Sequence, residues 1–247
     1  MSAKNIFLTG ASRGIGAVLA VELANRGHTV GCFSRKGVGP ESSLVPDELR
    51  DRLIFLKGDV TDPSSIAGAM ETFTAKVGSI HGLINNAGIQ AEAPSAHQPL
   101  ADFNEVIQTN VAGTFSACQQ IYPFLEKNGG GLIVNVGSFF DKMGVKRNAA
   151  YAASKAAIAA VGRCLAVEWA SKGIRVLTVA PGYIETDLNK EFLQSEKIKN
   201  YLASRIPVGG PGSAQDVAGL IAMLFKENMP YFTGETIYYD GGQGMAL

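Results

Sequence analysis

The chain has few charged residues and no net charge. Of its 247 residues, 22 are Lys or Arg and 22 are Asp or Glu, so that charged residues make up 18% of the sequence, against about 25% in an average globular protein. A balance of this kind gives no electrostatic attraction for nucleic acid or for an anionic membrane surface. We therefore expect neither nucleic acid nor a membrane as a partner.

Cysteine is also scarce. Cys32, Cys118 and Cys164 are far apart and form no Cys-x-x-Cys pair, and the three histidines are equally scattered. This pattern argues against a disulfide framework and against a metal site, so we expect three buried free thiols in a reducing compartment. Residues 1–5 lack the features of a secretory signal, and no uninterrupted apolar run reaches the roughly 18 residues of a membrane helix. We expect a cytoplasmic protein that needs no metal for its chemistry.

Glycine, by contrast, is abundant, at 29 of 247 residues, well above the usual share of about 7%. Short apolar runs alternate with longer stretches of helical period. The predicted strands cover 5–9, 29–34, 53–57, 83–85, 132–136, 174–179 and 236–239, and the predicted helices cover 14–26, 66–77, 100–127, 151–172, 187–204 and 214–226. This alternation predicts a single α/β domain over residues 1–247, with a doubly wound parallel sheet and helices on both faces.

A glycine-rich turn joins the first predicted strand to the first predicted helix. Its three glycines, Gly10, Gly14 and Gly16, have the spacing G-x-x-x-G-x-G. Glycines at such a turn allow a tight bend, close approach of a pyrophosphate, and close packing of the helix on the sheet. The phosphates would then lie at the positive end of the helix. The turn therefore predicts a dinucleotide site, which also includes the intervening Ser12, Arg13 and Ile15.

The end of the second predicted strand indicates which dinucleotide is bound. An acidic residue about 20 residues after the glycines usually holds a free ribose 2′-hydroxyl, but here the sequence is Phe33-Ser34-Arg35-Lys36. Ser34, Arg35 and Arg13 could instead hold a 2′-phosphate. A cation such as Arg13 is misplaced near a helix N-terminus unless an anion compensates it. The pattern favours NADP(H) over NAD(H), the alternative being that Arg35 is an ordinary exposed loop cation.

Tyr151 and Lys155 are spaced i, i+4, on one face of a predicted helix. A phenol with an unperturbed pKa of about 10 is a poor acid–base catalyst at neutral pH. A fixed cation within about 4–6 Å favours the phenolate and lowers that pKa. The spacing is therefore typical of a catalytic pair, although many helices carry such a pair on their surface.

Taken together, the motifs resemble those of the short-chain dehydrogenase/reductase family. The matching segments are Thr9–Gly16, Asn85-Asn-Ala-Gly88, Ser138, Tyr151-x-x-x-Lys155 and Pro181-Gly182. The resemblance implies a Rossmann-type sheet of about seven parallel strands in the order 3-2-1-4-5-6-7. It also implies hydride transfer to or from a nicotinamide cofactor, and commonly a homotetramer.

The same resemblance implies four catalytic residues. Tyr151 would be the acid–base, and Ser138 would hydrogen-bond the same substrate oxygen. Lys155 would bind the nicotinamide ribose and lower the pKa of Tyr151. Asn110 would hold a water that links Lys155 to solvent, the alternative for Asn110 being a satisfied structural amide.

Further cofactor contacts are implied in the same way. The residues concerned are Asn86, Ala87 and Gly88 beside the adenosine ribose, Asp59 and Val60 beside the adenine, and Pro181, Gly182, Ile184 and Thr186 around the nicotinamide carboxamide. Two positions depart from the common pattern of the family, Gly137 before the serine and Leu177 in the sixth predicted strand. Neither departure removes a catalytic atom.

The substrate side is predicted between the segment after Ser138 and a lid over about 183–210. Apolar and aromatic side chains there suggest an apolar substrate portion; they are Phe139, Phe140, Tyr183 and Leu188, with Ser138 and Tyr151 holding the carbonyl. The alternative for any one of these apolar side chains is the hydrophobic lid of a mobile helix or a contact between subunits. Basic residues could guide an acidic acyl carrier protein, or could simply be solvated; they are Lys142, Lys146, Arg147 and Lys172.

The whole chain is similar to the 3-oxoacyl-[acyl-carrier-protein] reductases of this family, which implies NADPH-dependent reduction of a ketone to a secondary alcohol. Oxidation of a specific secondary alcohol, sugar or hydroxysteroid is the alternative. A cofactor-binding regulator without catalysis is disfavoured, because the four catalytic positions are intact.

Overall fold

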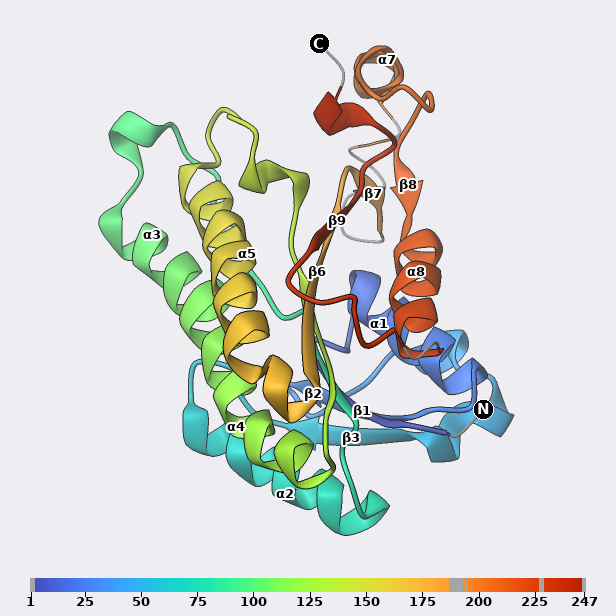
Figure 1. Ribbon diagram of the computed structural model, residues 1–247. Helices are drawn as coiled ribbons and strands as arrows, with labels where there is room; N and C mark the ends of the chain where they lie inside the picture. The colour runs from blue at the N-terminus through green and yellow to red at the C-terminus, as the bar shows by residue number, and fades with distance from the viewer. Residues whose placement is uncertain (1–2, 187–192, 194, 227–228, 246–247) are drawn as a thin grey trace.

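A parallel seven-stranded sheet forms the centre of the protein (Figure 1). The computed structural model describes residues 3–186, 193, 195–226 and 229–245. The strands of the sheet are β1 (Asn5–Thr9), β2 (Thr29–Ser34), β3 (Leu53–Lys57), β4 (Gly82–Asn85), β5 (Gly131–Val136), β6 (Ile174–Pro181) and β9 (Thr236–Tyr239). Their order is β3-β2-β1-β4-β5-β6-β9, and every neighbouring pair is parallel. The predicted fold class and strand order are confirmed, with β9 as the seventh strand of the sheet.

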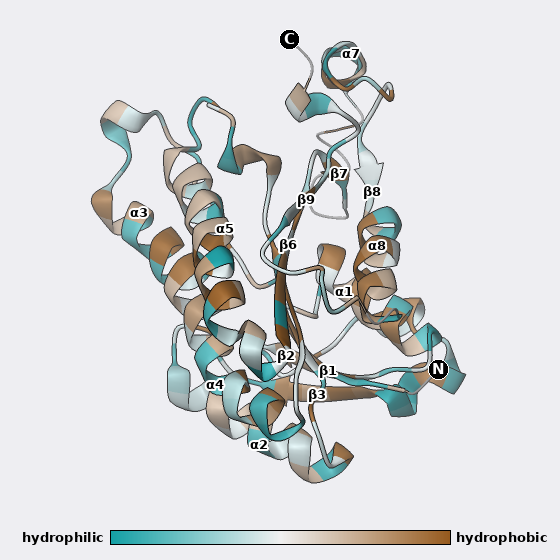
Figure 2. Cartoon of the chain, in the orientation of Figure 1, coloured by the Kyte–Doolittle hydropathy of each residue, from teal (hydrophilic) through white to brown (hydrophobic). Residues whose placement is uncertain are grey.

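Helices cover both faces of the sheet, as Figure 1 shows. They are α1 (Gly14–Asn25), α2 (Pro63–Val77), α3 (Leu100–Ile107), α4 (Gly113–Lys127), α5 (Ala149–Trp169), α7 (Glu196–Arg205) and α8 (Ala214–Lys226). One buried cluster joins Leu8 of β1 to α1 and α8, and the other joins Phe7 to α2, α4 and α5. Because consecutive strand residues point to opposite faces, a strand between two helical layers is apolar throughout. The apolar stretch of β6 in Figure 2 illustrates this.

The helical segment 100–127 departs from the prediction of one continuous helix. A π-helical turn, Gln108–Ala112, separates α3 from α4. The Asn110 side chain within this turn bonds to both backbone groups of Ile89, an interaction that sequence periodicity does not reveal. π-Helical turns within α-helices are frequent at functional sites.

Two short strands were not predicted, because two residues carry no periodicity. They are β7 (Ile184–Glu185) and β8 (Gly212–Ser213), which pair with each other outside the main sheet. The helix predicted over 187–204 falls partly outside the described residues, and α7 accounts for its second half. Leu188, predicted to contact substrate, also lies outside the described residues.

The prediction of three buried thiols is wrong for Cys164, which is exposed, whereas Cys32 and Cys118 are buried. Cys164 lies on α5, whose sheet-facing side is formed by other residues, including Ile158 and Leu165. A single cysteine in an alanine-rich helix gives no sequence signal of which way it points.

The segment Ala149–Lys172, which contains α5, is long and apolar enough to cross a membrane by length and composition alone. The segment is not an uninterrupted apolar run, because charged residues such as Lys155 lie within it. Nearly half of the apolar window is buried inside the protein, and Lys155 itself is only 4% exposed. The segment is therefore a core helix that packs against β6.

Candidate active site

The glycine turn between β1 and α1 lies at the carboxyl edge of the sheet, and its backbone requires glycine. Gly10 and Gly14 have φ angles of +69° and +56°, a region that side-chain-bearing residues rarely adopt. A Cβ on Gly16 would lie 2.1 Å from the Gly10 carbonyl oxygen and 2.4 Å from Asn86 Nδ2. The close packing predicted for this turn is therefore present, with the helix start pressed against the turn.

Thr9 and Asn86 brace the turn from the strand side. Asn86 Nδ2 donates to the carbonyl oxygens of Thr9 and Gly10, at 3.2 and 2.9 Å. Thr9 Oγ1 in turn accepts from the backbone N–H groups of Asn86 and Ala87, each at 3.1 Å. Asn86 thus supports the turn itself. Thr9 supports it too, a role that the motif Thr9–Gly16 did not predict for this residue.

The N-terminal end of α1 fits a phosphate. No side chain caps the helix at Arg13, and the first turn contains no acidic residue. N–H groups at a helix start need partners, and a phosphate oxygen satisfies them while interacting with the positive end of the helix dipole. Together with the glycine conformations, this geometry suits the pyrophosphate of a dinucleotide.

Arg13 and Arg35 are both exposed near this turn, and neither forms an ion pair within the part of the chain that the structure describes. Ser34 behaves differently, since its hydroxyl donates to the Val38 carbonyl oxygen at 2.6 Å and accepts from the Val38 N–H at 3.0 Å. Its one proton is thus used within its own loop. The two arginines, by contrast, can still donate to a phosphate group at this edge.

Asp59 and Val60 follow β3 at the same edge of the sheet. The Asp59 carboxylate accepts from the backbone N–H and the hydroxyl of Thr61, both at 2.9 Å. Val60 packs so closely on Gly113 that a Cβ there would lie 3.0 Å from the Val60 side chain. These contacts hold the loop predicted to lie beside the adenine in a defined conformation.

Tyr151, Ser138 and Lys155 come together between β5 and α5. Ser138 follows β5, and its side chain lies close enough to the Tyr151 hydroxyl to influence the pKa of that group. Lys155, one helical turn after Tyr151, places its Nζ 5.4 Å from the centre of the tyrosine ring. The three side chains therefore form one cluster, while their catalytic roles stay predictions.

The expectation of a lowered tyrosine pKa does not hold for the chain by itself. Burial raises the pKa of Tyr151, and the hydrogen bond with Ser138 opposes this only in part. Burial also lowers the pKa of Lys155 to about 8, and its ammonium donates to the Val136 carbonyl oxygen at 2.7 Å. Because removal from water disfavours the charged form of each group, desolvation dominates both shifts.

Asn110 is fully buried, and its side-chain amide is fully engaged. Its Oδ1 accepts from the Ile89 N–H at 2.8 Å, and its Nδ2 donates to the Ile89 carbonyl oxygen at 2.9 Å and to Ser154 Oγ at 3.0 Å. Ser154 Oγ donates to the Tyr151 carbonyl oxygen at 2.7 Å. Asn110 is thus tied to the helix of Tyr151 through Ser154, a residue that sequence reasoning missed.

Gly88 lies between Asn110 and Lys155. A Cβ on Gly88 would lie 3.3 Å from Asn110 Oδ1 and 3.8 Å from Lys155 Nζ. The structure therefore brings all four predicted catalytic residues into one region, with the segment after β4 running beside two of them.

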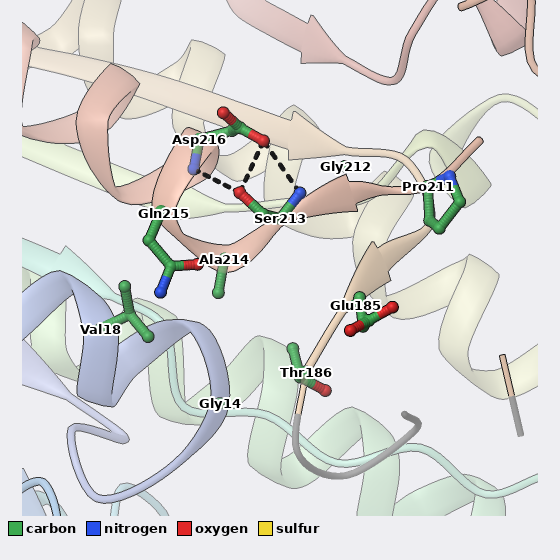
Figure 3. Close-up of a pocket in the computed structure, with 10 residues that line it drawn as sticks. All are labelled: Gly14, Val18, Glu185, Thr186, Pro211, Gly212, Ser213, Ala214, Gln215 and Asp216. Carbon is green, nitrogen blue, oxygen red and sulfur yellow. Dashed lines mark hydrogen bonds between the residues drawn. The ribbon is translucent and has the colours of Figure 1, made fainter. Parts of the chain in front are cut away.

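The segment after β6 faces the glycine turn across a cleft of about 370 Å³, shown in Figure 3. The cleft is lined by Gly14 and Val18 of α1, by Glu185 and Thr186, and by residues 211–216. Thr186 therefore lies across the cleft from Gly14, the first residue of α1.

Pro181, Gly182 and Ile184 precede that cleft. The Gly182 N–H donates to the Tyr239 carbonyl oxygen at 3.0 Å, and a Cβ on Gly182 would lie 2.7 Å from Asp240 Cα. Ile184 is 6% exposed and pairs with β8. The end of β6 is therefore fixed against the end of β9.

Aromatic rings form a wall beside Tyr151. The Phe140 ring centre lies 5.8 Å from that of Tyr151 and 4.7 Å from that of Phe139, with both pairs edge to face. Phe139 in turn lies 5.3 Å from Tyr183. We call Phe139, Phe140, Tyr151 and Tyr183 the aromatic wall; such rings favour apolar contacts with a bound molecule.

Three of the four basic residues considered for a carrier protein have partners within the chain. Arg147 pairs with Glu92 at 3.0 Å and Lys172 with Glu126 at 2.8 Å. Lys142 Nζ lies 3.4 Å from the ring centre of Tyr238. All of these residues are exposed to some degree, so their interactions with solvent screen these contacts.

A family model described as enoyl-(acyl carrier protein) reductase matches residues 10–243. The chain belongs to the short-chain dehydrogenase/reductase family. Among curated relatives, the 3-oxoacyl-[acyl-carrier-protein] reductase of Escherichia coli (strain K12) is 35% identical over 242 residues, which are 98% of each chain. The resemblance inferred from the motifs is thereby confirmed.

Solved structures of this family show the same fold. A gluconate 5-dehydrogenase from Burkholderia cenocepacia J2315, in complex with NADP and tartrate, has a TM-score of 0.90 at 28% identity and covers 100% of this chain and 97% of its own. A 3-ketoacyl-(acyl-carrier-protein) reductase from Brucella melitensis, complexed with NADH, has a TM-score of 0.88 at 27% identity over 98% of each chain. This short-chain dehydrogenase/reductase is therefore an NAD(P)-dependent oxidoreductase acting on CH–OH or C=O groups.

Proposed function

We propose that the protein is an NADPH-dependent reductase that converts a ketone, a 3-oxoacyl thioester or a similar carbonyl compound, to a secondary alcohol. The observation that carries this proposal is the grouping of the Tyr151 and Ser138 side chains, with Lys155 Nζ 5.4 Å from the centre of the tyrosine ring, beside the aromatic wall. Two hydroxyls at one point can both donate to a single carbonyl oxygen. Since burial raises the pKa of Tyr151, its proton is present for transfer at neutral pH.

The chain's own residues have separate tasks in such a reduction. Bound NADPH supplies the hydride that adds to the carbonyl carbon. Ser138 and Tyr151 hold the carbonyl oxygen, and Tyr151 gives its proton to that oxygen as the carbon–oxygen π bond is lost, which completes the alcohol. Lys155 stabilises the phenolate that Tyr151 becomes, because its ammonium lies 5.4 Å from the centre of the tyrosine ring.

Arg35 and Arg13 would hold the 2′-phosphate that distinguishes NADPH from NADH. Both are exposed at the carboxyl edge of the sheet, and guanidinium groups form strong bonds with phosphate. The neighbour that carries NADP supports this preference, while the neighbour that carries NADH shows that the fold accommodates either cofactor. The other cofactor contacts are proposed at the positions named above.

Oxidation of a secondary alcohol is the second candidate. The gluconate 5-dehydrogenase neighbour supports it, because its structure matches this chain over its whole length. A sugar acid requires polar partners in the pocket, whereas the side chains grouped beside Tyr151 are aromatic, with Phe139 and Phe140 themselves buried. The wall therefore favours the ketone with an apolar substituent over the sugar. A regulator without catalysis is disfavoured by the intact catalytic cluster.

The substrate would lie under a lid over about 183–210 within the single domain. Tyr183 packs with Leu193, Leu202 and Ile206 into a small apolar cluster of its own, separate from the two clusters of the main sheet. Tyr183 therefore connects this small cluster to the aromatic wall.

We further propose a cytoplasmic homotetramer. Helices α4 and α5 leave apolar side chains in solvent, with Phe115 40% and Val167 84% exposed, and such surface favours contact with another copy. An acyl carrier protein as substrate carrier is supported by the likeness of this chain to two acyl-carrier-protein reductases. Lys146, an exposed cation, is available to it without breaking an ion pair among the described residues.

The test is a panel of ketones and alcohols, including 3-oxoacyl thioesters and gluconate, followed by NADPH and NADH absorbance. The proposal expects the highest kcat/KM with NADPH and an acyl thioester or another ketone with an apolar substituent. Faster turnover of gluconate with NADP than of any ketone with NADPH would favour the alternative instead.

A further inference from the structure

Tyr238 on β9 reaches across to the turn that follows Ser138. Its hydroxyl donates to Asp141 Oδ2 at 2.8 Å, although the two residues are 97 positions apart. Tyr238 aligns with Ala180 of β6 in the sheet, so its backbone is fixed by strand pairing. The hydrogen bond thus connects a rigid strand to the loop that carries part of the active site.

Asp141 is closely coupled to Ser138 through the short turn Phe139–Asp141. The Asp141 N–H donates to the Ser138 carbonyl oxygen at 3.0 Å, and the Phe140 N–H donates to Ser138 Oγ at 3.3 Å. A displacement of Asp141 therefore moves both the Ser138 hydroxyl and the Phe140 ring. These are the two groups that contact Tyr151 from this loop.

Lys142 adds a second contact between the same segments. Its ammonium lies 3.4 Å from the ring centre of Tyr238. This is a cation–π contact, which needs the aromatic ring and not the hydroxyl. Removal of the hydroxyl therefore leaves this contact in place. The hydrogen bond to Asp141 is the interaction that a single oxygen atom can remove.

The Tyr238–Asp141 bond persists over the working pH range of such an enzyme. Burial and the neighbouring Asp141 raise the pKa of Tyr238 to about 12, so the phenol stays a donor. The pKa of Asp141 is raised by burial, and the hydrogen bond from Tyr238 and the charges of Lys142 and Arg163 oppose this shift only in part. The groups that face the pair from neighbouring elements also include Asp240.

We propose that Tyr238 is a positioning residue, which holds Asp141 and thereby sets Ser138 and Phe140 against Tyr151 at the substrate face. Neither Tyr238 nor Asp141 belongs to the motif set that defines the family. The inference rests on the proposed ketone reduction for its kinetic part, but the physical tie between β9 and the turn is independent of that reaction.

Tyr238→Phe tests the tie by removing one oxygen atom. We expect amide hydrogen exchange in residues 138–142 to rise about tenfold, since a hydrogen bond to a charged group is lost, with no change in β1. We also expect either that the KM for the ketone rises about tenfold or that kcat falls about tenfold, with the dissociation constant for NADPH unchanged. Tyr239→Phe is the matched control, because Tyr239 is adjacent and 39% exposed, and it should behave as the parent.

Asp141→Asn retains an acceptor for the Tyr238 hydroxyl and should keep most of the parental ketone KM. Asp141→Leu removes it and should reproduce the effect of Tyr238→Phe. Unchanged exchange in residues 138–142, or an unchanged kcat/KM for the ketone, overturns the positioning role. If the parent reduces no ketone, the proposed function fails, and the exchange measurement still decides whether Tyr238 holds the turn.

Discussion

The cofactor side and the substrate side of this active site are built in different ways. The glycine turn between β1 and α1 is held by backbone groups, including the Phe33 carbonyl oxygen of β2, and by Asn86, which follows β4. The aromatic wall is assembled from side chains that follow β5 and β6 and from Tyr151 of α5, and Tyr238 of β9 is linked to it through Asp141. The glycine turn tolerates few substitutions. Substitutions in the aromatic wall can alter which substrate is bound while the sheet stays the same.

The difference also predicts where substitutions act. A side chain added at the turn collides with backbone, which cannot move away without disturbing the sheet. A side chain changed in the wall meets other side chains, because the members of the wall contact one another. We therefore expect the largest losses on the cofactor side and graded changes of specificity on the substrate side.

Gly16→Ala should have the largest effect. The new Cβ would lie 2.1 Å from the Gly10 carbonyl oxygen, so the turn must open, at a cost of about 3 kcal/mol in the free energy of unfolding. We expect NADPH affinity to fall by about a hundredfold or more, measured by fluorescence titration. Gly68→Ala is the matched control: its Cβ meets nothing within 4 Å on α2, and it should stabilise the protein by about 0.5–1 kcal/mol. Equal NADPH affinity in both variants would contradict the packing described for the turn.

Lys155→Met should change the pH dependence of stability. The Lys155 pKa is about 8 in the folded chain and 10.5 ordinarily, so between these values the unfolded state binds the extra proton. Stability of the parent relative to the variant should therefore be constant below about pH 8 and rise by about 3 kcal/mol toward pH 10.5. Urea unfolding of both proteins at several pH values measures this difference. A difference that falls with pH would show that Lys155 is not desolvated.

Arg35→Ala should have a smaller and more selective effect. Loss of one guanidinium–phosphate contact should weaken NADPH by about tenfold while NADH binding stays the same. Ser34→Ala is the informative comparison, because the Ser34 hydroxyl is already bonded to Val38. This substitution should leave the ratio of NADPH affinity to NADH affinity unchanged. Equal losses for both cofactors in Arg35→Ala would refute the assignment of the 2′-phosphate.

The fold and the cofactor motif could be read from the sequence because they depend on local patterns. Strand and helix alternate with clear periods, and the glycine turn lies within eight residues. The π-helical turn around Asn110 could not be read, since it depends on Ile89, 21 residues away. The exposure of Cys164 depends on how α5 is rotated against the sheet. The raised pKa of Tyr151 depends on burial, which the Tyr–Lys spacing alone does not reveal.

The Tyr238–Asp141 bond shows the same limit most clearly. Neither residue has a sequence signal, and the contact joins positions 97 residues apart. Only the sheet order, which places β9 beside β6, brings them together. A contact of this kind depends on the folded sheet and not on a local sequence pattern.

The central claim is that the Tyr151 hydroxyl donates the proton in ketone reduction, and Tyr151→Phe tests it directly. The substitution removes one oxygen atom from a side chain whose ring packs against Phe140, so the aromatic wall should persist. Single-turnover reduction of the best ketone by bound NADPH should slow by about 10²–10⁴-fold, with NADPH affinity unchanged. Reduction at the parental rate would contradict the account.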